Sequence, residues 1–297
     1  MGEKHIVAPP LFSRPSRSGR RGLVWGTVAL VLVAVTAVVF VCVLKSKPSS
    51  GLGELQAKWE KLSSDAQTEE AAKVMLEIRG AAVEIYNQRK FDEARKAFEW
   101  IVAKDPKCGM ALNFLGLMER SRAETEARKA DEAQGIKPPA PPKALPNYDK
   151  AIDFFRRAEL ADPLTPTYYY NLALLYYQQK NYADCEKQVQ QAMKTGLKAQ
   201  YHFLYVRCAE EAKQPPEVVK RRLHDTVSCA EAQAYSVTPG DLAPDGSLAW
   251  IWKESARKLA EAGDDYGWER IRKASTGAAK PEVREFAKSL LKSAAKP

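Results

Sequence analysis

One short pattern recurs three times in the chain, and it limits the possible folds more than any other feature of the sequence. Each copy has an aromatic residue, a small residue three positions later and an apolar residue four positions further on. The copies are Phe91, Ala94 and Phe98; Tyr148, Ala151 and Phe155; and Tyr182, Cys185 and Val189. On an α-helix these spacings place the small and the apolar residue on one face. The first two copies are followed by Asp-Pro, and a residue before proline avoids the helical conformation, so each of these helices is expected to end there.

A second helix is expected before each copy. Apolar residues at helical spacing precede all three copies, and each of these upstream segments carries a small residue on its apolar face: Ala82, Gly116 and Ala173. We expect these three to lie against Ala94, Ala151 and Cys185, respectively. Small side chains at a crossing let two helix backbones approach closely. The sequence therefore predicts three helical pairs.

This arrangement resembles the tetratricopeptide repeat, a helix–turn–helix unit of about 34 residues. The resemblance covers Met75–Cys108, Gly109–Thr165 and Pro166–Ala199, and the second copy has 23 extra residues between its helices. Leu197–Cys229 looks like a fourth, degenerate pair. The resemblance implies an all-α solenoid with one continuous core, whose open ends are covered by residues 54–74 and by C-terminal helices.

The rest of the chain is also predicted to be helical or irregular, with no alternating pattern typical of a strand. Helices are expected over Ala111–Gln134, from Pro216 to near Cys229, over Leu248–Ala262 and over Pro281–Ala294. The predicted organisation is a basic tail (1–21), a transmembrane helix (22–44), a linker (45–53), the repeats (54–229) with an insertion at about 120–147, and a loop with capping helices (230–297). The insertion contains five prolines, and it is read either as a mobile surface loop or as a partner-docking arm with polyproline II character.

Residues 22–44 form an uncharged, mostly apolar run of 23 residues. As a helix this run would be about 34 Å long, which is enough to cross a bilayer core of about 30 Å. A cleaved signal peptide is the alternative, but its apolar run is about 7–15 residues long and ends in small residues. The longer run here, followed by Lys45 and Lys47, favours an uncleaved single-pass anchor. Arginines concentrated before the run favour a cytoplasmic N-terminus and an extracytoplasmic (in a bacterium, periplasmic) domain.

The formal charge of +9 does not indicate a nucleic-acid partner. Residues 1–50 hold seven Lys or Arg and one Glu, so the remaining residues carry a net charge of only +3. A nucleic-acid-binding domain would concentrate basic residues on one of its own faces. The expected partners are therefore other proteins and, through residues 22–44, a lipid bilayer; self-association is left open.

No catalytic residue, metal ligand or cofactor is predicted. The chain has no nucleophile-elbow, phosphate-loop or zinc-protease motif. His202 and His224 have no acidic or Cys partner at metal-ligand spacing, and His5 lies in the tail. Cys185 occupies a small core position and is read as a buried thiol. Cys208 and Cys229 would form a disulfide if they meet across one helical pair in an oxidising compartment.

The resemblance also implies a partner-binding face, because the first helices of tetratricopeptide pairs line a concave groove. The aligned positions in this sequence are Arg79, Asn113, Arg120, Tyr170, Leu174, Tyr177 and Gln178. Tyrosine suits recognition because it buries a large area and keeps a hydrogen-bonding tip, although packing against the next helix is the alternative. The family's carboxylate clamp is not matched, since Val83, Leu117 and Leu174 stand where that clamp has a polar residue.

The function expected from these features is that of a membrane-anchored scaffold or adaptor in a membrane or cell-envelope complex. Two alternatives remain: a receptor whose repeats face the cytosol, and a structural subunit of a large membrane-associated machine. Each of the three is a binding protein, and none requires an enzyme.

Overall fold

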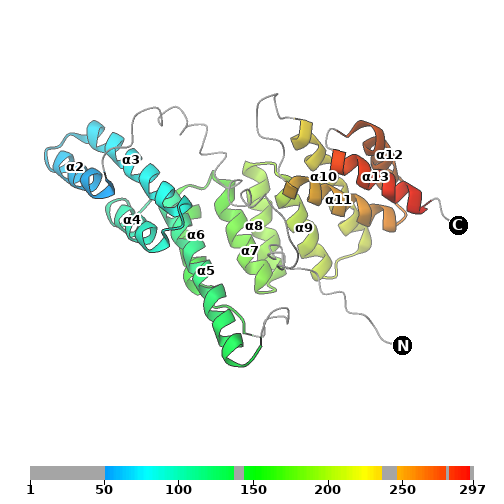
Figure 1. Ribbon diagram of the computed structural model, residues 1–297, viewed down its shortest axis with the longest axis horizontal. Coiled ribbons are helices and arrows are strands. Elements are labelled where there is room, and N and C mark those ends of the chain that lie inside the picture. The colour runs from blue at the N-terminus through cyan, green and yellow to red at the C-terminus, as the bar shows by residue number, and fades with distance from the viewer. Residues whose placement is uncertain (1–50, 137–143, 236–245, 279–280, 295–297) are drawn as a thin grey trace, which may run out of the picture.

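The computed structural model describes residues 51–136, 144–235, 246–278 and 281–294. Within these residues the chain forms twelve α-helices and no strand (Figure 1). In chain order they are α2 (Leu52–Ser64), α3 (Thr68–Asn87), α4 (Phe91–Lys104), α5 (Gly109–Ala133), α6 (Asp149–Ala161), α7 (Pro166–Gln178), α8 (Tyr182–Thr195), α9 (Ala199–Glu211), α10 (Pro216–Tyr235), α11 (Gly246–Glu261), α12 (Asp265–Gly277) and α13 (Pro281–Ala294).

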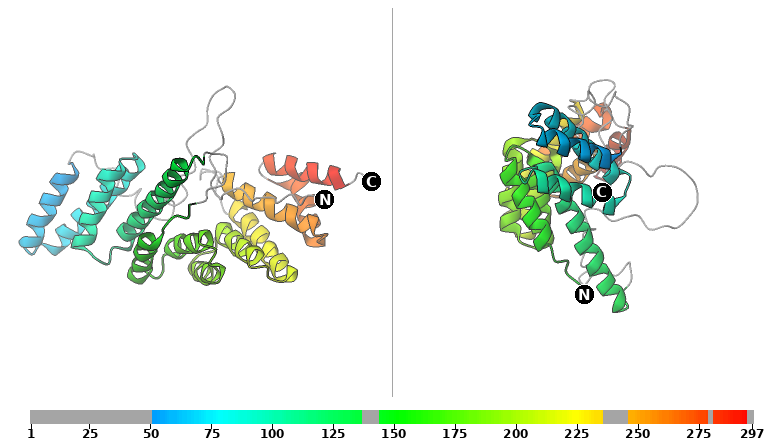
Figure 2. Two further views of the ribbon diagram at one scale, coloured as in Figure 1. Left: turned by 90° about the horizontal axis from the view of Figure 1, so that it is seen from below. Right: turned by 90° about the vertical axis from the view of Figure 1, so that its left-hand side faces the viewer.

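The helices pack in sequence order along an arc (Figure 2). Helices α3 and α4, α5 and α6, α7 and α8, and α9 and α10 form four consecutive pairs. Helix α2 packs on α3 at one end of the arc, and α11 packs on α9 and α10 near the other. Because each pair contacts mainly its neighbours, the molecule is an all-α solenoid, as the recurring pattern predicts.

The small residues lie inside the pairs, where the sequence places them. Ala82 and Ala94 are fully buried in one apolar cluster, and Ala173 and Cys185 are fully buried in the next. Gly116 lies directly against the ring of Phe155, so that a Cβ atom at Gly116 would come within 2.7 Å of that ring. In the second pair, α6 therefore approaches α5 at a position that has no side chain.

Three of the turns inside the pairs share a backbone feature that the repeat pattern does not mention. Arg89, Lys180 and Lys213 have φ values of 62°, 60° and 53°, in the left-handed region. In the third pair, the Lys180 amide donates to the carbonyl of Tyr177 (3.0 Å) and the Asn181 amide to that of Tyr176 (2.8 Å). These bonds satisfy carbonyls at the end of the first helix. The fourth pair therefore has the same turn as the first and third, although its sequence is degenerate.

Several helix boundaries differ from the predictions. Helix α12 was not predicted; it begins where the Asp264 carboxylate accepts a hydrogen bond from the amide of Gly267 (2.9 Å) and so caps the helix. Helix α10 continues past Cys229 to Tyr235, and on this extra turn Glu231 accepts from the Trp252 indole (3.1 Å) and pairs with Arg270 (3.0 Å). Tertiary contacts of this kind are not visible in local spacing.

The first half of the insertion is helical, as the predicted helix over Ala111–Gln134 implies, so the alternative of a mobile loop does not apply to residues 120–133. Helix α5 continues to Ala133 and extends beyond its pair (Figure 1). Beyond residues 137–143, which lie outside the described residues, the chain returns along this extension, and the Asp131 carboxylate accepts from the amide of Ala144 (2.8 Å). Ala123 and Ala127 are buried on the extension.

The cysteine pairing also differs from the prediction. Cys185 of α8 and Cys208 of α9 form a disulfide, whereas Cys229 is a free, half-buried thiol. The two bonded residues are both fully buried at the junction between the third and fourth pairs.

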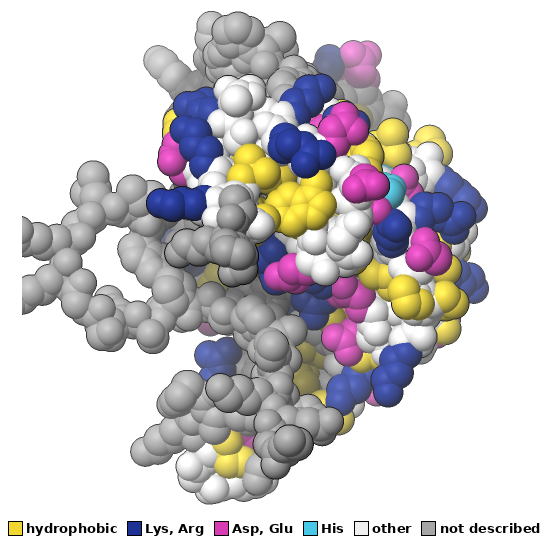
Figure 3. Space-filling model, turned by 90° about the vertical axis from the view of Figure 1, so that its right-hand side faces the viewer, with side chains coloured by type: hydrophobic (Ala, Val, Ile, Leu, Met, Phe, Trp, Pro, Cys, Tyr) yellow, Lys and Arg dark blue, Asp and Glu magenta, His cyan; other side chains and the backbone are white. Residues whose placement is uncertain are grey.

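The C-terminal helices close the arc. Apolar residues of α9 to α13 share one core cluster, which includes Phe203, Val227, Trp252, Ile271 and Ala287. On the outer surface at this end, apolar side chains are interspersed with basic and acidic ones (Figure 3). A mixed outer surface is what a capping element of a solenoid needs in water.

No helix among the described residues has both the length and the apolar character of a membrane span. The predicted anchor at residues 22–44 lies outside the described residues, as do the basic tail and most of the linker.

Candidate functional site: a face of tyrosines and arginines

The seven predicted binding residues do not form one open surface. Asn113 is buried, and its carbonyl oxygen accepts a hydrogen bond from the buried Asn171 amide (2.7 Å), which joins α5 to α7. Leu174 is buried in the core of the third pair, whereas Gln178 is exposed at the end of α7. Arg79 pairs with Asp105 (2.7 Å) near the first end of the arc. Asn113 and Leu174 are therefore packing residues and not contacts for a partner.

Arg120 of α5 acts electrostatically on residues of three helical pairs. Its Nε donates to the Glu124 carboxylate one turn along α5 (2.8 Å), and its side chain is 18% exposed. Its positive charge lowers the pKa of three tyrosines on three other helices: Tyr86 of α3, Tyr148 at the start of α6 and Tyr170 of α7. The Arg120 guanidinium therefore acts on both Tyr86 and Tyr170, which are 84 positions apart in the chain.

The electrostatics keep these hydroxyls protonated at neutral pH. Burial is the main cause that raises the pKa of Tyr86, Tyr148 and Tyr170, and the Arg120 charge counteracts it at each. At Tyr148 the Glu124 carboxylate adds to the effect of burial, and the pKa rises to about 12. A protonated phenol both donates and accepts a hydrogen bond.

Tyr170 and Tyr177 contact the next helix, α9. The Tyr170 ring packs against Tyr201 with ring centroids 4.9 Å apart. The Tyr177 hydroxyl accepts a hydrogen bond from Arg207 Nη2 (2.9 Å), and the Arg207 guanidinium lies 5.8 Å from the centroid of the Tyr177 ring. Both tyrosines remain half-buried rather than fully buried. These contacts support the packing interpretation of the two tyrosines, and their role in recognition stays a prediction.

Together these residues define the tyrosine–arginine face: Tyr86, Arg120, Tyr170, Tyr177 and Arg207. They come from the first helices of all four pairs, α3, α5, α7 and α9. Aromatic rings next to guanidinium groups offer flat apolar area together with hydrogen-bond donors. Such a face can contact a partner chain, but it has no arrangement of a nucleophile and a base that would perform chemistry.

The comparisons with known proteins agree with this architecture. The tetratricopeptide repeat family model matches residues 81–141 and 144–196. These residues are therefore similar to tetratricopeptide repeats. No curated protein matches the chain.

Solved structures resemble the chain only distantly. MamA has 12% identity and a TM-score of 0.41, and the match covers 73% of this chain and 97% of MamA. The pilF protein of Pseudomonas aeruginosa has 13% identity and a TM-score of 0.43, with 72% and 89% covered. A thermophilic tetratricopeptide protein of Thermus thermophilus has 13% identity and a TM-score of 0.41, with 73% and 99% covered. With TM-scores below 0.5, none of these likenesses adds to the assignment.

Sequence reasoning missed Tyr86, Tyr148 and Arg207. Tyr86 occupies the same place in its tetratricopeptide repeat as Arg120 and Tyr177 do in theirs, eleven residues after the first position, so the alignment contained the signal. Arg207 belongs to the degenerate fourth pair, whose positions could not be aligned with those of the other repeats. Tyr148 was identified only as the aromatic residue of the second copy, and the return of the chain beside α5 reveals its contact with Glu124.

The histidines serve other contacts. The ring Nε2 of His224 lies 2.9 Å from the Asp264 carboxylate that caps α12. Burial lowers the pKa of His202, which keeps its imidazole neutral at neutral pH, and Asp225 opposes this effect. Within the described residues, no three His, Cys, Asp or Glu side chains come together as a metal site requires.

Proposed function

We propose that this chain is a membrane-tethered tetratricopeptide scaffold that binds other proteins through the tyrosine–arginine face, in the assembly or function of a membrane or cell-envelope complex. The observation that supports this proposal best is the row of half-buried tyrosines and arginines on successive first helices. Tyrosine and arginine are enriched among the residues that contribute most to protein–protein binding. A solenoid also presents such a row on one long surface.

The tether in this proposal is the uncharged run at 22–44, with the repeats on the extracytoplasmic side. Its length suits a bilayer, and the arginines before it favour a cytoplasmic N-terminus. The disulfide between Cys185 and Cys208 supports the same side, since disulfides persist in oxidising compartments. Tethering would hold the binding face close to membrane complexes and raise its effective concentration there.

Cross-linking in native membranes, followed by mass spectrometry, tests the face. Arg120→Gln should reduce partner recovery, because it removes the cation at the centre of the tyrosine–arginine face. Arg122→Gln is the matched control: Arg122 lies on the same helix, is 54% exposed and pairs with Glu126 (2.8 Å). Equal recovery for the two variants, with unchanged helicity, would count against the face.

Protease treatment of sealed membranes tests the topology. The proposal expects the repeats to be protected when the cytoplasmic side is exposed to protease. Digestion of the repeats from that side would refute this topology and favour the alternative of a receptor whose repeats face the cytosol. Recovery of one assembly at constant stoichiometry in mild detergent would instead favour a structural subunit.

A further inference from the structure

Three turns connect one helical pair to the next, and they lie together along one edge of the solenoid. They comprise residues 105–108, 162–165 and 196–198. A Cβ atom at Gly196, in the third turn, would lie 3.1 Å from Cγ of Pro166, which follows the second turn. A Cβ atom at Gly109, which follows the first turn, would lie 3.0 Å from the ring of Tyr168 at the start of α7. The second turn therefore lies beside both of the others, and we call the three together the turn edge.

Large apolar side chains are exposed on the turn edge. Leu164 of the second turn is 77% exposed, and Leu197 of the third turn is 71% exposed. Leu160, in the last turn of α6 just before the second turn, is 80% exposed. A single exposed leucine is ordinary on a protein surface, but an apolar patch formed by several of them marks an interaction site.

The turns that carry these leucines are held by hydrogen bonds within the protein. The Asp162 carboxylate accepts from the amide of Leu164 (3.3 Å) and from the hydroxyl of Thr165. The carbonyl of Leu197 accepts from Nε2 of Gln233 on α10 (3.0 Å). Polar groups that are already bonded lose less when they leave water. Both turns can therefore enter an environment poorer in water than the bulk solvent.

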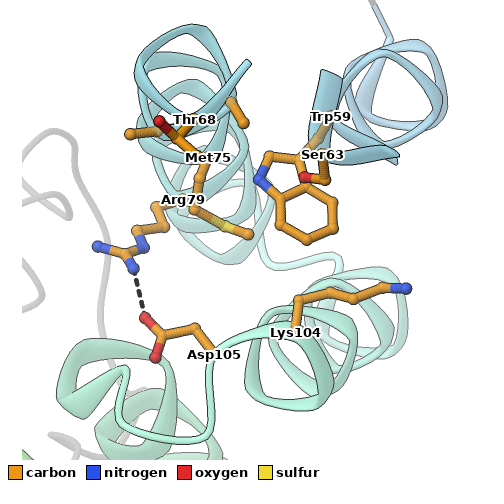
Figure 4. A pocket seen from close by; sticks show the side chains of 9 residues that line it. Trp59, Ser63, Thr68, Met75, Arg79, Lys104 and Asp105 are labelled. Atoms are coloured by element: carbon orange, nitrogen blue, oxygen red, sulfur yellow. Dashed lines mark hydrogen bonds and ion pairs between the residues drawn. The ribbon is translucent and has the colours of Figure 1, made fainter. Parts of the chain in front are cut away.

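The freely exposed charges of the turn edge are positive. Lys107 of the first turn and Lys194, at the end of α8, are exposed, and neither forms an ion pair with a described residue. The acidic side chains near the turns are instead half-buried: Asp105, Glu159 and Asp162. Arg79 of α3 also donates to the Asp105 carboxylate (2.7 Å), as Figure 4 shows. The two lysines are therefore available to an anionic partner.

We infer that the turn edge docks on an anionic lipid surface. The three leucines enter the headgroup region of the bilayer, and the two lysines lie near the lipid phosphates. Apolar side chains next to basic ones are the combination by which proteins bind the surface of an anionic membrane. A second copy of the chain fits this edge less well, because a symmetric contact would bring the same positive charges together across the interface.

This contact goes beyond the proposed function and shares no residue with the tyrosine–arginine face. In the proposed function the run at 22–44 only keeps the repeats close to a bilayer. A second contact through the turn edge would also fix how the solenoid is oriented on that bilayer. The two contacts can be tested separately.

Photo-crosslinking of the full chain in lipid vesicles tests the inference. Benzoylphenylalanine takes the place of Leu164 or of Leu197, and mass spectrometry identifies the molecule that it captures. The vesicles contain either phosphatidylcholine alone or a mixture of phosphatidylcholine and phosphatidylglycerol. We expect lipid adducts at both positions in the mixed vesicles and several times fewer in phosphatidylcholine, because each lysine near an anionic surface favours the contact by about fivefold.

Leu145 provides the matched control position. It is 83% exposed but lies before the start of α6, whereas the turn edge lies at the other end of this helix, which is about 20 Å long. Benzoylphenylalanine in place of Leu145 should capture little lipid. Lys107→Gln combined with Lys194→Gln should lower lipid capture at position 164, whereas Lys96→Gln, at an exposed position on α4, should not.

Several outcomes would overturn the inference. These are equal lipid capture at positions 145 and 164, equal capture in the two kinds of vesicle, and equal effects of the lysine variants. Adducts to a second copy of the chain in place of lipid would overturn it in favour of self-association. Adducts are measured before an alkaline wash, so release of the chain by that wash would refute the proposed tether alone. Arg120→Gln should weaken partner recovery but leave lipid capture unchanged.

Discussion

Replacing Gly116 by Ala should destabilise the protein, although the same change stabilises most exposed helices. In a helix interior Ala is favoured over Gly by about 1 kcal/mol. Here the added Cβ would lie 2.7, 2.8 and 3.0 Å from three atoms of the Phe155 ring. That ring is fully buried between α5 and α6 and has little room to move. Overpacking of a core costs about 1–3 kcal/mol, and the number of close contacts points to the upper part of that range. The net effect is a loss of about 1–2 kcal/mol in the free energy of unfolding.

Urea denaturation followed by circular dichroism at 222 nm measures this change. Gly53→Ala is the control, since no atom lies within 4 Å of a Cβ at that position in α2, and it should not lower the midpoint. Phe155→Leu should destabilise the parent protein, but it should cost less when Gly116→Ala is already present. A higher midpoint for Gly116→Ala alone would refute the claim that the helices of this pair cross where one side chain is missing.

Three further outcomes follow from the structure. Replacing both Cys185 and Cys208 by Ala should lower the free energy of unfolding by about 3 kcal/mol, as loop closure over a sequence separation of 23 implies; a reductant should then weaken the parent protein but not the variant in urea titrations. The Tyr148 pKa is raised to about 12 from an unfolded value of about 10, so its contribution to the free energy of unfolding is complete below pH 10 and is lost as the pH rises through 12. Between these pH values the melting temperature should fall less for Tyr148→Phe than for the parent protein. Lys180→Gly should raise the melting temperature, because Lys180 has a left-handed φ of 60° that costs a non-glycine residue about 1 kcal/mol.

The repeated pairs could be predicted from sequence because their signal is local and occurs several times. A small residue and an apolar residue four positions apart specify one helix face, and Asp-Pro specifies where the helix ends. Helix α13 shows the same effect at the C-terminus, where Pro281 starts a strongly amphipathic helix over the predicted range. Helix α12 escaped prediction although it is as long as α6, α7 and α9 and Asp264 is a typical N-cap.

The site was harder to predict because it depends on contacts between repeats. Alignment to the family placed Arg120, Tyr170 and Tyr177 on the correct helices but could not show that Asn113 bonds to Asn171 inside the core. The cysteine pairing failed for a similar reason. Cys208 was compared with the second helix of its own pair, whereas its partner lies on the second helix of the preceding pair.

The bond between Cys185 and Cys208 has a mechanical consequence for the arc. A solenoid bends by small rotations at each junction between neighbouring repeats, and these junctions normally share the deformation. A covalent link across one of them stiffens it relative to those between the first and second and between the second and third pairs. Any widening of the arc around a partner should then concentrate on the N-terminal side of the bond. In a reducing environment this disulfide would be broken, and all the junctions between pairs would then bend to a similar extent.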